Sequence, residues 1–376
     1  MRPVIYFDNA ASTEPLDEVL RVYTRAAKEI YGNPSSLHGY GVAAENEIKG
    51  AASSIAELLG VSPDELVFTS GGTESNNQAI SGAASRARKS ANFVTTAAEH
   101  PSVSECFAAL KKNNLTVKVV ETGADGRVDP VRLLEAVDGD TALVSVVHIN
   151  NETGAVNQIR EIGAAIKRAD KNILFHVDGV QSFGKYRVDL YGSGVDLFSF
   201  SAHKIHGLKG VGCLFVKNGT RLSPLLYGGG QQRELRPGTE NAAGITAFAE
   251  ASRVAYRDMD KNFKIAASVR DVLLKITGRD GAAVNGDLKN GSPYILNMSF
   301  AGHKGEIILN ALSGEGIYVS TGSACNGRRG KQNALVKMGV TAERAESAVR
   351  FSFSRFNTIG EAAECVGALD KILDRF

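Results

Sequence analysis

Apolar runs with the length of β-strands alternate with helical patterns from about residue 60 to residue 220, and this alternation constrains the fold more than any other feature. The strand-like runs cover residues 65–69, 92–96, 116–121, 141–147, 173–177, 195–200 and 211–216. Helical patterns lie between them, at 75–88, 103–112, 130–136 and 159–169. The alternation predicts an α/β fold with a large, mainly parallel seven-stranded sheet and helices on both of its faces.

The chain of 376 residues is too long for one hydrophobic core and predicts two domains. A long loop rich in glycine and polar residues, 227–241, follows the alternating region, and two helical patterns, 242–260 and 261–277, come after it. The remainder has the pattern of a smaller α/β unit. We therefore expect a large domain over 15–250 and a small domain made of 1–14 and 251–376.

Charge and cysteine content narrow the class of protein. A net charge of +2 gives no electrostatic reason for binding nucleic acid or an anionic membrane. Residues 1–9 have no apolar core of signal-peptide length, and no stretch of the chain approaches the length of a membrane span. The four cysteines, at 106, 213, 325 and 365, are scattered without a Cys-x-x-Cys pair, which is typical of a reducing compartment. We expect a cytoplasmic protein without membrane or direct nucleic-acid contacts.

Two charged residues follow neighbouring strand-like runs. Lys204 comes just after the run 195–200, and open α/β sheets bind ligands outside the carboxyl ends of their strands. A desolvated lysine there can lose its proton and form a Schiff base with a carbonyl group. Asp178 ends the run 173–177, where a buried carboxylate needs a cationic partner. Either a protonated pyridine nitrogen or an arginine would satisfy it.

The same edge of the sheet carries further polar residues. A glycine-rich turn with Gly72 and Thr73 joins a strand to a helix, which favours phosphate binding, although it matches neither dinucleotide nor Walker patterns. His100 follows the next strand and could stack on a planar cofactor, move protons or simply cap a helix. Asn151 follows the run 141–147 and could bind a polar ring substituent.

These residues together have the chemistry that pyridoxal 5′-phosphate (PLP) requires. PLP needs a lysine for its aldehyde, an acid for its ring nitrogen and an anion cradle. Ser201 and His203 lie close enough to Lys204 in the chain to help hold the phosphate. The sequence therefore predicts a PLP site at the carboxyl edge of the sheet. His203-x-x-His206 with Cys213 fits no common zinc site, so we expect no metal.

The motifs also resemble a known family, the cysteine desulfurases, which are fold-type I PLP enzymes related to class V aminotransferases. The resemblance runs in order over nearly the whole chain. It is carried by Asp8-Asn9-Ala10-Ala11, Gly32-Asn33-Pro34-Ser35-Ser36, Thr69-Ser70-Gly71-Gly72-Thr73-Glu74-Ser75-Asn76, Glu99-His100, Asn150-Asn151-Glu152, His176-Val177-Asp178, Ser201-Ala202-His203-Lys204 and Ser323-Ala324-Cys325. It implies an aspartate-aminotransferase-like fold, a homodimer, and conversion of L-cysteine to L-alanine with a persulfide left on the enzyme.

Roles carried over by position follow from the resemblance. Lys204 would bind the aldehyde carbon of PLP, Asp178 would pair with the ring nitrogen, and His100 would stack on the ring. Gln181 and Asn151 would contact the phenolic oxygen. Phosphate binding would fall to Gly72, Thr73, Ser201, His203 and, in the partner subunit, Thr239. Substrate binding would fall to Asn33 and to Arg350, whose guanidinium would grip the carboxylate, with Arg355 as the weaker candidate.

Cys325 would be the sulfur-accepting nucleophile of such an enzyme. It lies in a small, polar stretch that predicts an exposed loop, where the nearby cations Arg328, Arg329 and Lys331 would lower the pKa of its thiol. The segment after Cys325 looks shorter and more basic than in relatives that supply iron–sulfur scaffolds. The sulfur acceptor is therefore open between an iron–sulfur scaffold and a tRNA-thiolation protein. A selenocysteine lyase, a class V aminotransferase and a catalytically silent scaffold are the alternative functions.

Overall fold

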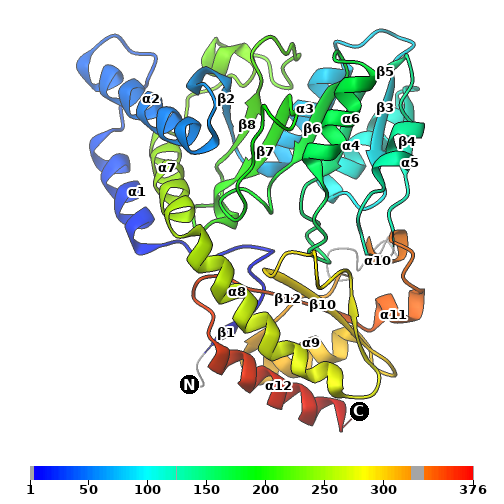
Figure 1. The fold of residues 1–376 in the computed structure, drawn as a ribbon. Coiled ribbons are helices and arrows are strands. Elements are labelled where there is room, and N and C mark those ends of the chain that lie inside the picture. Colours follow the sequence, from blue (N-terminus) through cyan, green and yellow to red (C-terminus); the bar gives the residue numbers. More distant parts are fainter. Residues whose placement is uncertain (1–3, 124, 323–333, 376) are drawn as a thin grey trace.

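The computed structural model describes residues 4–123, 125–322 and 334–375. Its centre is a seven-stranded sheet with the order β2-β8-β7-β6-β5-β3-β4 (Figure 1). The strands are β2 (Leu66–Thr69), β3 (Asn92–Thr96), β4 (Thr116–Val120), β5 (Thr141–Val147), β6 (Leu174–Asp178), β7 (Leu197–Ser201) and β8 (Gly212–Val216). Of these seven strands, β8 alone runs opposite to the other six, so the predicted mainly parallel sheet is confirmed.

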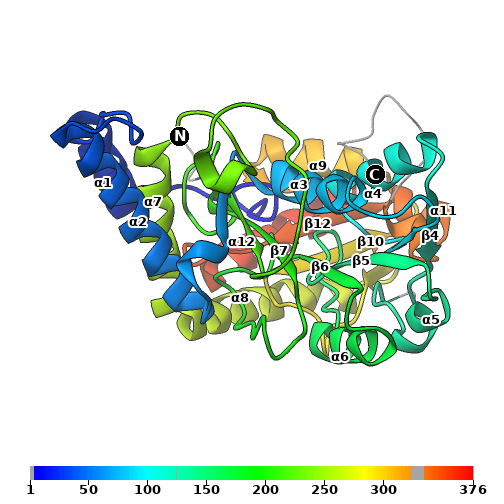
Figure 2. The ribbon, with the colours of Figure 1, turned by 90° about the horizontal axis from the view of Figure 1, so that it is seen from above.

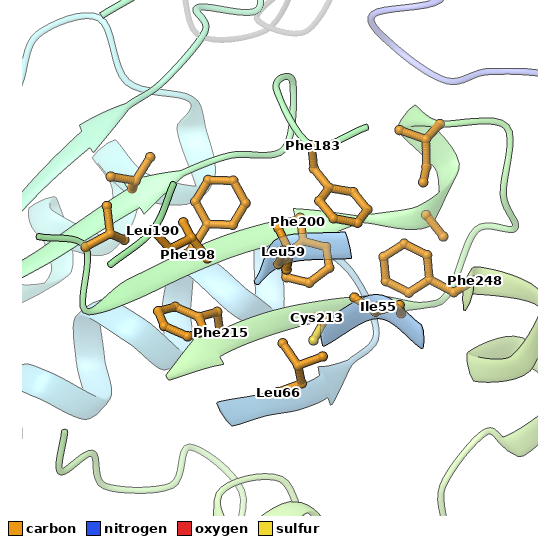
Figure 3. Close-up of a cluster of buried hydrophobic side chains, with 14 of the residues drawn as sticks. Ile55, Leu59, Leu66, Phe183, Leu190, Phe198, Phe200, Cys213, Phe215 and Phe248 are labelled. Carbon is orange, nitrogen blue, oxygen red and sulfur yellow. The ribbon is translucent and has the colours of Figure 1, made fainter. Parts of the chain in front are cut away.

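Helices cover both faces of this sheet because successive strand residues point to opposite sides. On β7, Leu197 packs into the core under α3 (Gly72–Ala84) and α4 (Pro101–Lys112). The next residue, Phe198, belongs to the opposite core, which Phe200 and Phe215 share (Figure 3). That core is covered by α2 (Gly39–Leu59), α6 (Ile159–Ala169) and α7 (Ala242–Arg257), and Figure 2 shows α3 and α6 on opposite sides of the sheet.

Two long helices precede the alternating region, and the sequence pattern did not reveal them. They are α1 (Asp17–Glu29) and α2, and both pack against α7 at one end of the sheet (Figure 1). The face that α2 buries is built largely from small residues, among them Ala44, Ala51 and Ala56. Small residues give little contrast in hydrophobicity between the two faces of a helix, so α2 is hard to recognise from the spacing of apolar residues.

A smaller unit has its own antiparallel sheet, with the order β12-β10-β9. Its strands are β9 (Ala282–Asn285), β10 (Ile295–Phe300) and β12 (Ala348–Ser352), and β1 (Ile5–Tyr6) pairs in parallel with β11 (Ile317–Tyr318) nearby. The helices of this part are α8 (Met259–Leu273), α9 (Gly305–Gly314), α10 (Ala334–Lys337), α11 (Ala342–Glu346) and α12 (Ile359–Leu373). The chain thus returns to an α/β arrangement after α7.

Short segments complete the chain. They are α5 (Pro130–Glu135) and the 3-10 turns η1 (Pro63–Glu65), η2 (Ala202–Lys204), η3 (Gln231–Glu234) and η4 (Leu274–Gly278). The main core includes Leu16 and Met259, whereas a second core joins Ile5 to residues from Ala266 onward. The change of core supports the division into 15–250 and 1–14 with 251–376, which we retain as a proposal. Along the described ranges, no helix is both long and apolar enough to cross a lipid bilayer.

Candidate active site

A cavity of about 410 Å³ opens at the carboxyl ends of the parallel strands, where open α/β sheets bind ligands. Its walls come from the ends of β5 and β6, the start of α3, the turn η2 and β12 of the smaller unit. Nine of the predicted site residues line it: Gly72, Thr73, His100, Asn151, Asp178, Gln181, His203, Lys204 and Arg350. Residues separated by almost 280 positions in the chain therefore meet at one place.

Lys204 lies in η2, directly after β7. Its Nζ donates hydrogen bonds to the carbonyl oxygens of Ala10 at 2.6 Å and of Ala11 at 2.9 Å. The N-terminal segment thus holds the amine, which borders the cavity. An amine positioned in this way can reach a ligand aldehyde without a change of fold.

Asp178 ends β6 and is 97% buried, with 3% of its surface exposed. Its Oδ2 accepts a hydrogen bond from Asn76 Nδ2 at 2.8 Å, and its Oδ1 accepts one from the Val180 amide at 3.0 Å. Within the described ranges no arginine or lysine forms an ion pair with it, so the arginine alternative is not observed there. Two hydrogen bonds without a cation leave this buried carboxylate suited to a basic ligand nitrogen.

Asn76 is a residue that the sequence reasoning did not single out. It lies on α3, one turn after Gly72, lines the cavity and is buried. Its Nδ2 bonds both Asp178 and the Ser102 hydroxyl. The position one helical turn beyond the glycine-rich turn was the available signal, because side chains three or four positions apart share a helix face.

His100 fills the N-cap position of α4 and also borders the cavity. Its Nδ1 accepts a hydrogen bond from the Ser102 amide at 3.1 Å and lies 2.8 Å from the Ser102 hydroxyl. Burial lowers the pKa of the imidazole, Asp178 opposes this, and the charge of Lys204 adds to it. The capping and cavity-lining interpretations of His100 are therefore compatible, and the ring is neutral near pH 7.

The glycine-rich turn forms the open N-terminus of α3. Gly71, the N-cap residue, has φ 156° and ψ −178°, and no side chain caps the helix. A Cβ added to Gly72 would lie 2.6 Å from Val180 Cγ2, so the backbone approaches its neighbour too closely for a side chain. Exposed amides and the helix dipole at this point favour an anion.

Two further residues predicted to bind phosphate lie near this turn. Ser201 is buried, outside the cavity lining, and its Oγ lies 3.9 Å from where a Cβ on Gly71 would stand. His203 lines the cavity, and its Nδ1 lies 3.3 Å from the Ser12 hydroxyl. Burial, helped by the charges of Lys204 and other lysines, lowers the pKa of His203 to about 4. A neutral His203 can donate or accept a hydrogen bond but adds no charge at pH 7.

Two amide side chains lie on the cavity wall. Gln181 donates through Nε2 to the Ala10 carbonyl at 2.9 Å, and its Oε1 accepts from Lys185 Nζ at 3.2 Å. Asn151 donates through Nδ2 to Glu152 Oε1 at 2.9 Å. These two contacts fix the orientation of the Gln181 amide, since its nitrogen faces the Ala10 carbonyl and its oxygen faces the Lys185 amine.

Arg350 on β12 reaches the cavity from the smaller unit. Its Nη2 lies 2.9 Å from Asp8 Oδ1, and its Nη1 lies 3.1 Å from Glu152 Oε1. A substrate carboxylate at Arg350 would therefore share the guanidinium with two carboxylates. Arg355 instead pairs with Asp258 at 2.9 Å and lies outside this cavity.

Besides Ser201, two predicted site residues that the structure describes do not line the cavity. Asn33 and Thr239 are both exposed, and neither lines it. Cys325 lies outside the described residues. Cys106, Cys213 and Cys365 are buried, and burial raises the pKa of each thiol.

The arrangement can hold a planar ligand with an anionic group, a basic ring nitrogen and an electrophilic carbon. The anion fits the α3 N-terminus, the nitrogen fits Asp178, and the carbon fits Lys204. In the described part of the chain, no group of three or more His, Cys, Asp or Glu side chains is arranged to hold a metal ion.

The comparisons with known proteins agree with this chemistry. The family model described as aminotransferase class-V matches residues 5–364. The chain belongs to this family. It is 41% identical to a NifS/IcsS protein homolog from Lactobacillus delbrueckii subsp. bulgaricus, over 99% of this chain and 98% of the relative. It is 37% identical to the cysteine desulfurase IscS of Dictyoglomus turgidum, over 100% of this chain and 96% of the relative.

Solved structures of family members have the same fold. A NifS-like protein superposes with a TM-score of 0.93 at 36% identity, with full coverage of both chains. DndA from Streptomyces lividans gives a TM-score of 0.79 at 32% identity and covers 93% of this chain and 99% of its own. The predicted family and fold class are confirmed.

Proposed function

We propose that this protein is a PLP-dependent cysteine desulfurase, which converts L-cysteine to L-alanine and passes the sulfur to Cys325. The observation that carries the proposal is the meeting of Lys204 and the buried Asp178, which has no cationic partner among the described residues, in one cavity beside an open helix N-terminus. Relatives that are 37% and 36% identical over nearly the whole chain bear the name cysteine desulfurase.

The donor set fits PLP. Lys204 would bind its aldehyde carbon, Asp178 its ring nitrogen, and the amides at Gly72 and Thr73 its phosphate, helped by Ser201 and His203. Gln181 and Asn151 would bind the phenolic oxygen, and His100 would lie against the ring. When bound, PLP withdraws electrons from the bonds at the α-carbon of an amino acid.

The chain's own groups would perform the remaining work. Arg350 would orient the cysteine carboxylate by a forked hydrogen bond, with Asp8 and Glu152 holding the guanidinium in place. Lys204, released from the aldehyde, would move the α-proton. Because His100 has a lowered pKa, its neutral ring can accept a proton near the leaving sulfur.

Sulfur transfer requires a thiolate, and Cys325 is our candidate. Its thiolate would form a bond to the substrate sulfur as the carbon–sulfur bond breaks, which leaves a persulfide on the enzyme. The electron pair of the broken bond would stay with the carbon, which takes up a proton to give alanine. Burial raises the thiol pKa of Cys106, Cys213 and Cys365, which opposes thiolate formation at these positions.

We also propose a homodimer that completes each site. Thr239 would reach the phosphate, and Asn33 the substrate, of the partner subunit, since neither lines the cavity of its own chain. Two large apolar side chains on the same loops support this proposal, because Leu37 is 98% exposed and Tyr227 is 90% exposed. The sulfur acceptor would be a cytoplasmic protein, either an iron–sulfur scaffold or a tRNA-thiolation protein.

The test supplies L-cysteine and a thiol reductant to the PLP-loaded protein. We expect sulfide and alanine in equal amounts, and we expect Cys325→Ala to stop sulfide release. Cys106→Ala is the matched control and should keep full turnover. If Cys325→Ala turned over cysteine as fast as the unchanged protein, the proposal that Cys325 accepts the sulfur would be wrong.

The same assay separates two alternatives. A class V aminotransferase would produce a keto acid and the aminated cofactor. A selenocysteine lyase would release selenium from selenocysteine with or without Cys325 and would leave L-cysteine intact. Equal yields of sulfide and alanine from L-cysteine exclude both.

A further inference from the structure

A second lysine lies behind the candidate active site. Lys185 is partly buried, its Nζ lies 5.4 Å from the centre of the Tyr294 ring, and it donates to Gln181 Oε1 at 3.2 Å. In the described ranges no carboxylate forms an ion pair with it. A partly buried amine without a counter-ion loses part of its hydration, so its position calls for an explanation.

Hydrogen bonds connect Lys185 to Lys204 through two groups. Lys185 donates to Gln181, Gln181 donates to the Ala10 carbonyl, and the same carbonyl accepts from Lys204 Nζ. An amine in its charged form only donates, so Lys185 requires the oxygen of the Gln181 amide to face it. The Gln181 nitrogen is then turned away from Lys185.

Lys185 and Lys204 both line a small cavity of about 30 Å³. Tyr294 and Asn262 line the same cavity, and among the described residues the Tyr294 hydroxyl and Asn262 Oδ1 are buried without a hydrogen-bond partner. The space is large enough for a water molecule, which would satisfy these atoms. Lys185 and Lys204 thus border the same small cavity.

We propose that Lys185 is a positioning residue, which fixes the amide of Gln181 toward bound PLP and places a second positive charge beside Lys204. The proposal rests on the proposed PLP-dependent function and adds a residue to it. Burial, together with the charge of Lys204, lowers the pKa of Lys185 to about 7, so this amine carries its positive charge at and below neutral pH. The titratable and charged groups that face this region are Lys204, His203, His206, Tyr186, Tyr294 and the Arg355–Asp258 pair.

The test compares three variants of the full-length, PLP-loaded protein. We measure the equilibrium dissociation constant for PLP and the pH midpoint of the visible absorbance of bound PLP. Lys185→Met should weaken PLP binding about tenfold, the loss expected for one charged hydrogen bond. It should also raise the pH midpoint, because removal of a nearby positive charge favours a proton at Lys204. Lys185→Arg should restore the midpoint toward that of the unchanged protein.

Two controls make the result specific. Lys209→Met removes an exposed lysine near the same site and should change neither quantity. Gln181→Leu should weaken PLP binding, and adding Lys185→Met to it should weaken binding no further, because both changes break one contact. If Lys185→Met fails to fold, the PLP affinity and the pH midpoint can still be measured for Lys185→Arg and for Gln181→Leu.

The proposal is overturned if Lys185→Met keeps the midpoint and affinity of the unchanged protein, if the two changes add fully, or if Lys185→Arg shifts the midpoint as far as Lys185→Met. An unchanged protein that binds no PLP would overturn the proposed function and this inference together. These outcomes are distinguishable because the unchanged protein is measured first.

Discussion

Replacement of Arg350 by methionine tests the charge network at the cavity wall. The side chains of Arg350, Asp8 and Glu152 are only 7%, 22% and 14% exposed, so the change leaves two carboxylates close together without the guanidinium that both contact. Breaking a buried charge pair costs about 3–5 kcal/mol. Because Asp8 is partly screened by water, we expect the lower end, about 3 kcal/mol at pH 8.

The free energy of unfolding that Arg350→Met removes should increase as the pH rises. Burial already raises the pKa of Glu152, and the charge of Arg350 opposes that rise. Without Arg350 the folded-state pKa lies still further above the unfolded value of about 4.3. A raised carboxyl pKa costs stability progressively as the pH rises from the unfolded pKa through the folded one. Arg350→Met should therefore be less destabilising at pH 5.5 than at pH 8.

Urea unfolding of the PLP-free protein, followed by circular dichroism at both pH values, measures this difference. Arg355→Met is the matched control, because its partner Asp258 has a pKa held below its usual range, first of all by Arg257. The stability that such a lowered carboxyl pKa contributes is constant above pH 5, so the control should lose the same amount at both pH values. Adding Glu152→Gln to Arg350→Met should recover part of the loss. An equal loss at pH 5.5 and pH 8 for Arg350→Met would refute the reasoning.

Three further changes probe other parts of the cavity. Gly72→Val should weaken PLP binding at least tenfold in equilibrium titrations, because its Cβ would lie 2.6 Å from Val180 Cγ2. His100→Gln should remove the acid limb of the pH–rate profile, which in the unchanged protein should lie below pH 6.5 because burial lowers the imidazole pKa. Asn76→Ala removes a hydrogen bond to the buried Asp178 and should cost about 1.5–3 kcal/mol in unfolding experiments, whereas Asn77→Ala, at a partly exposed position that does not contact Asp178, should cost less than about 1 kcal/mol.

The residues at strand ends were predictable from the sequence. The rule that parallel strands present their carboxyl ends to a ligand places Lys204, Asp178 and His100 at one edge, and all three line the cavity. The bounds of the strands differ by one or two residues, as for β7, which continues to Ser201 because Ser201 pairs with Gly212 of β8. Such cross-strand pairing is not visible in a local pattern.

Contacts between distant residues could not be predicted. Arg350 meets Asp8 across 342 positions and Glu152 across 198 positions, and no local spacing reveals either pair. The bond between Lys185 and Gln181 spans four positions, but its meaning depends on Ala10 and Lys204 from elsewhere in the chain. The proposed roles of Asn33 and Thr239 depend on a second chain, whose placement no single-chain pattern contains.

The covalent attachment of PLP to Lys204 is the central claim, and borohydride reduction tests it most directly. The purified protein should be yellow, and the colour should disappear on reduction with borohydride because the Schiff base becomes a stable amine. Peptide mass spectrometry should then find one phosphopyridoxyl group on Lys204. A colourless PLP-treated protein, or a reduced cofactor on another lysine such as Lys185, would contradict the account.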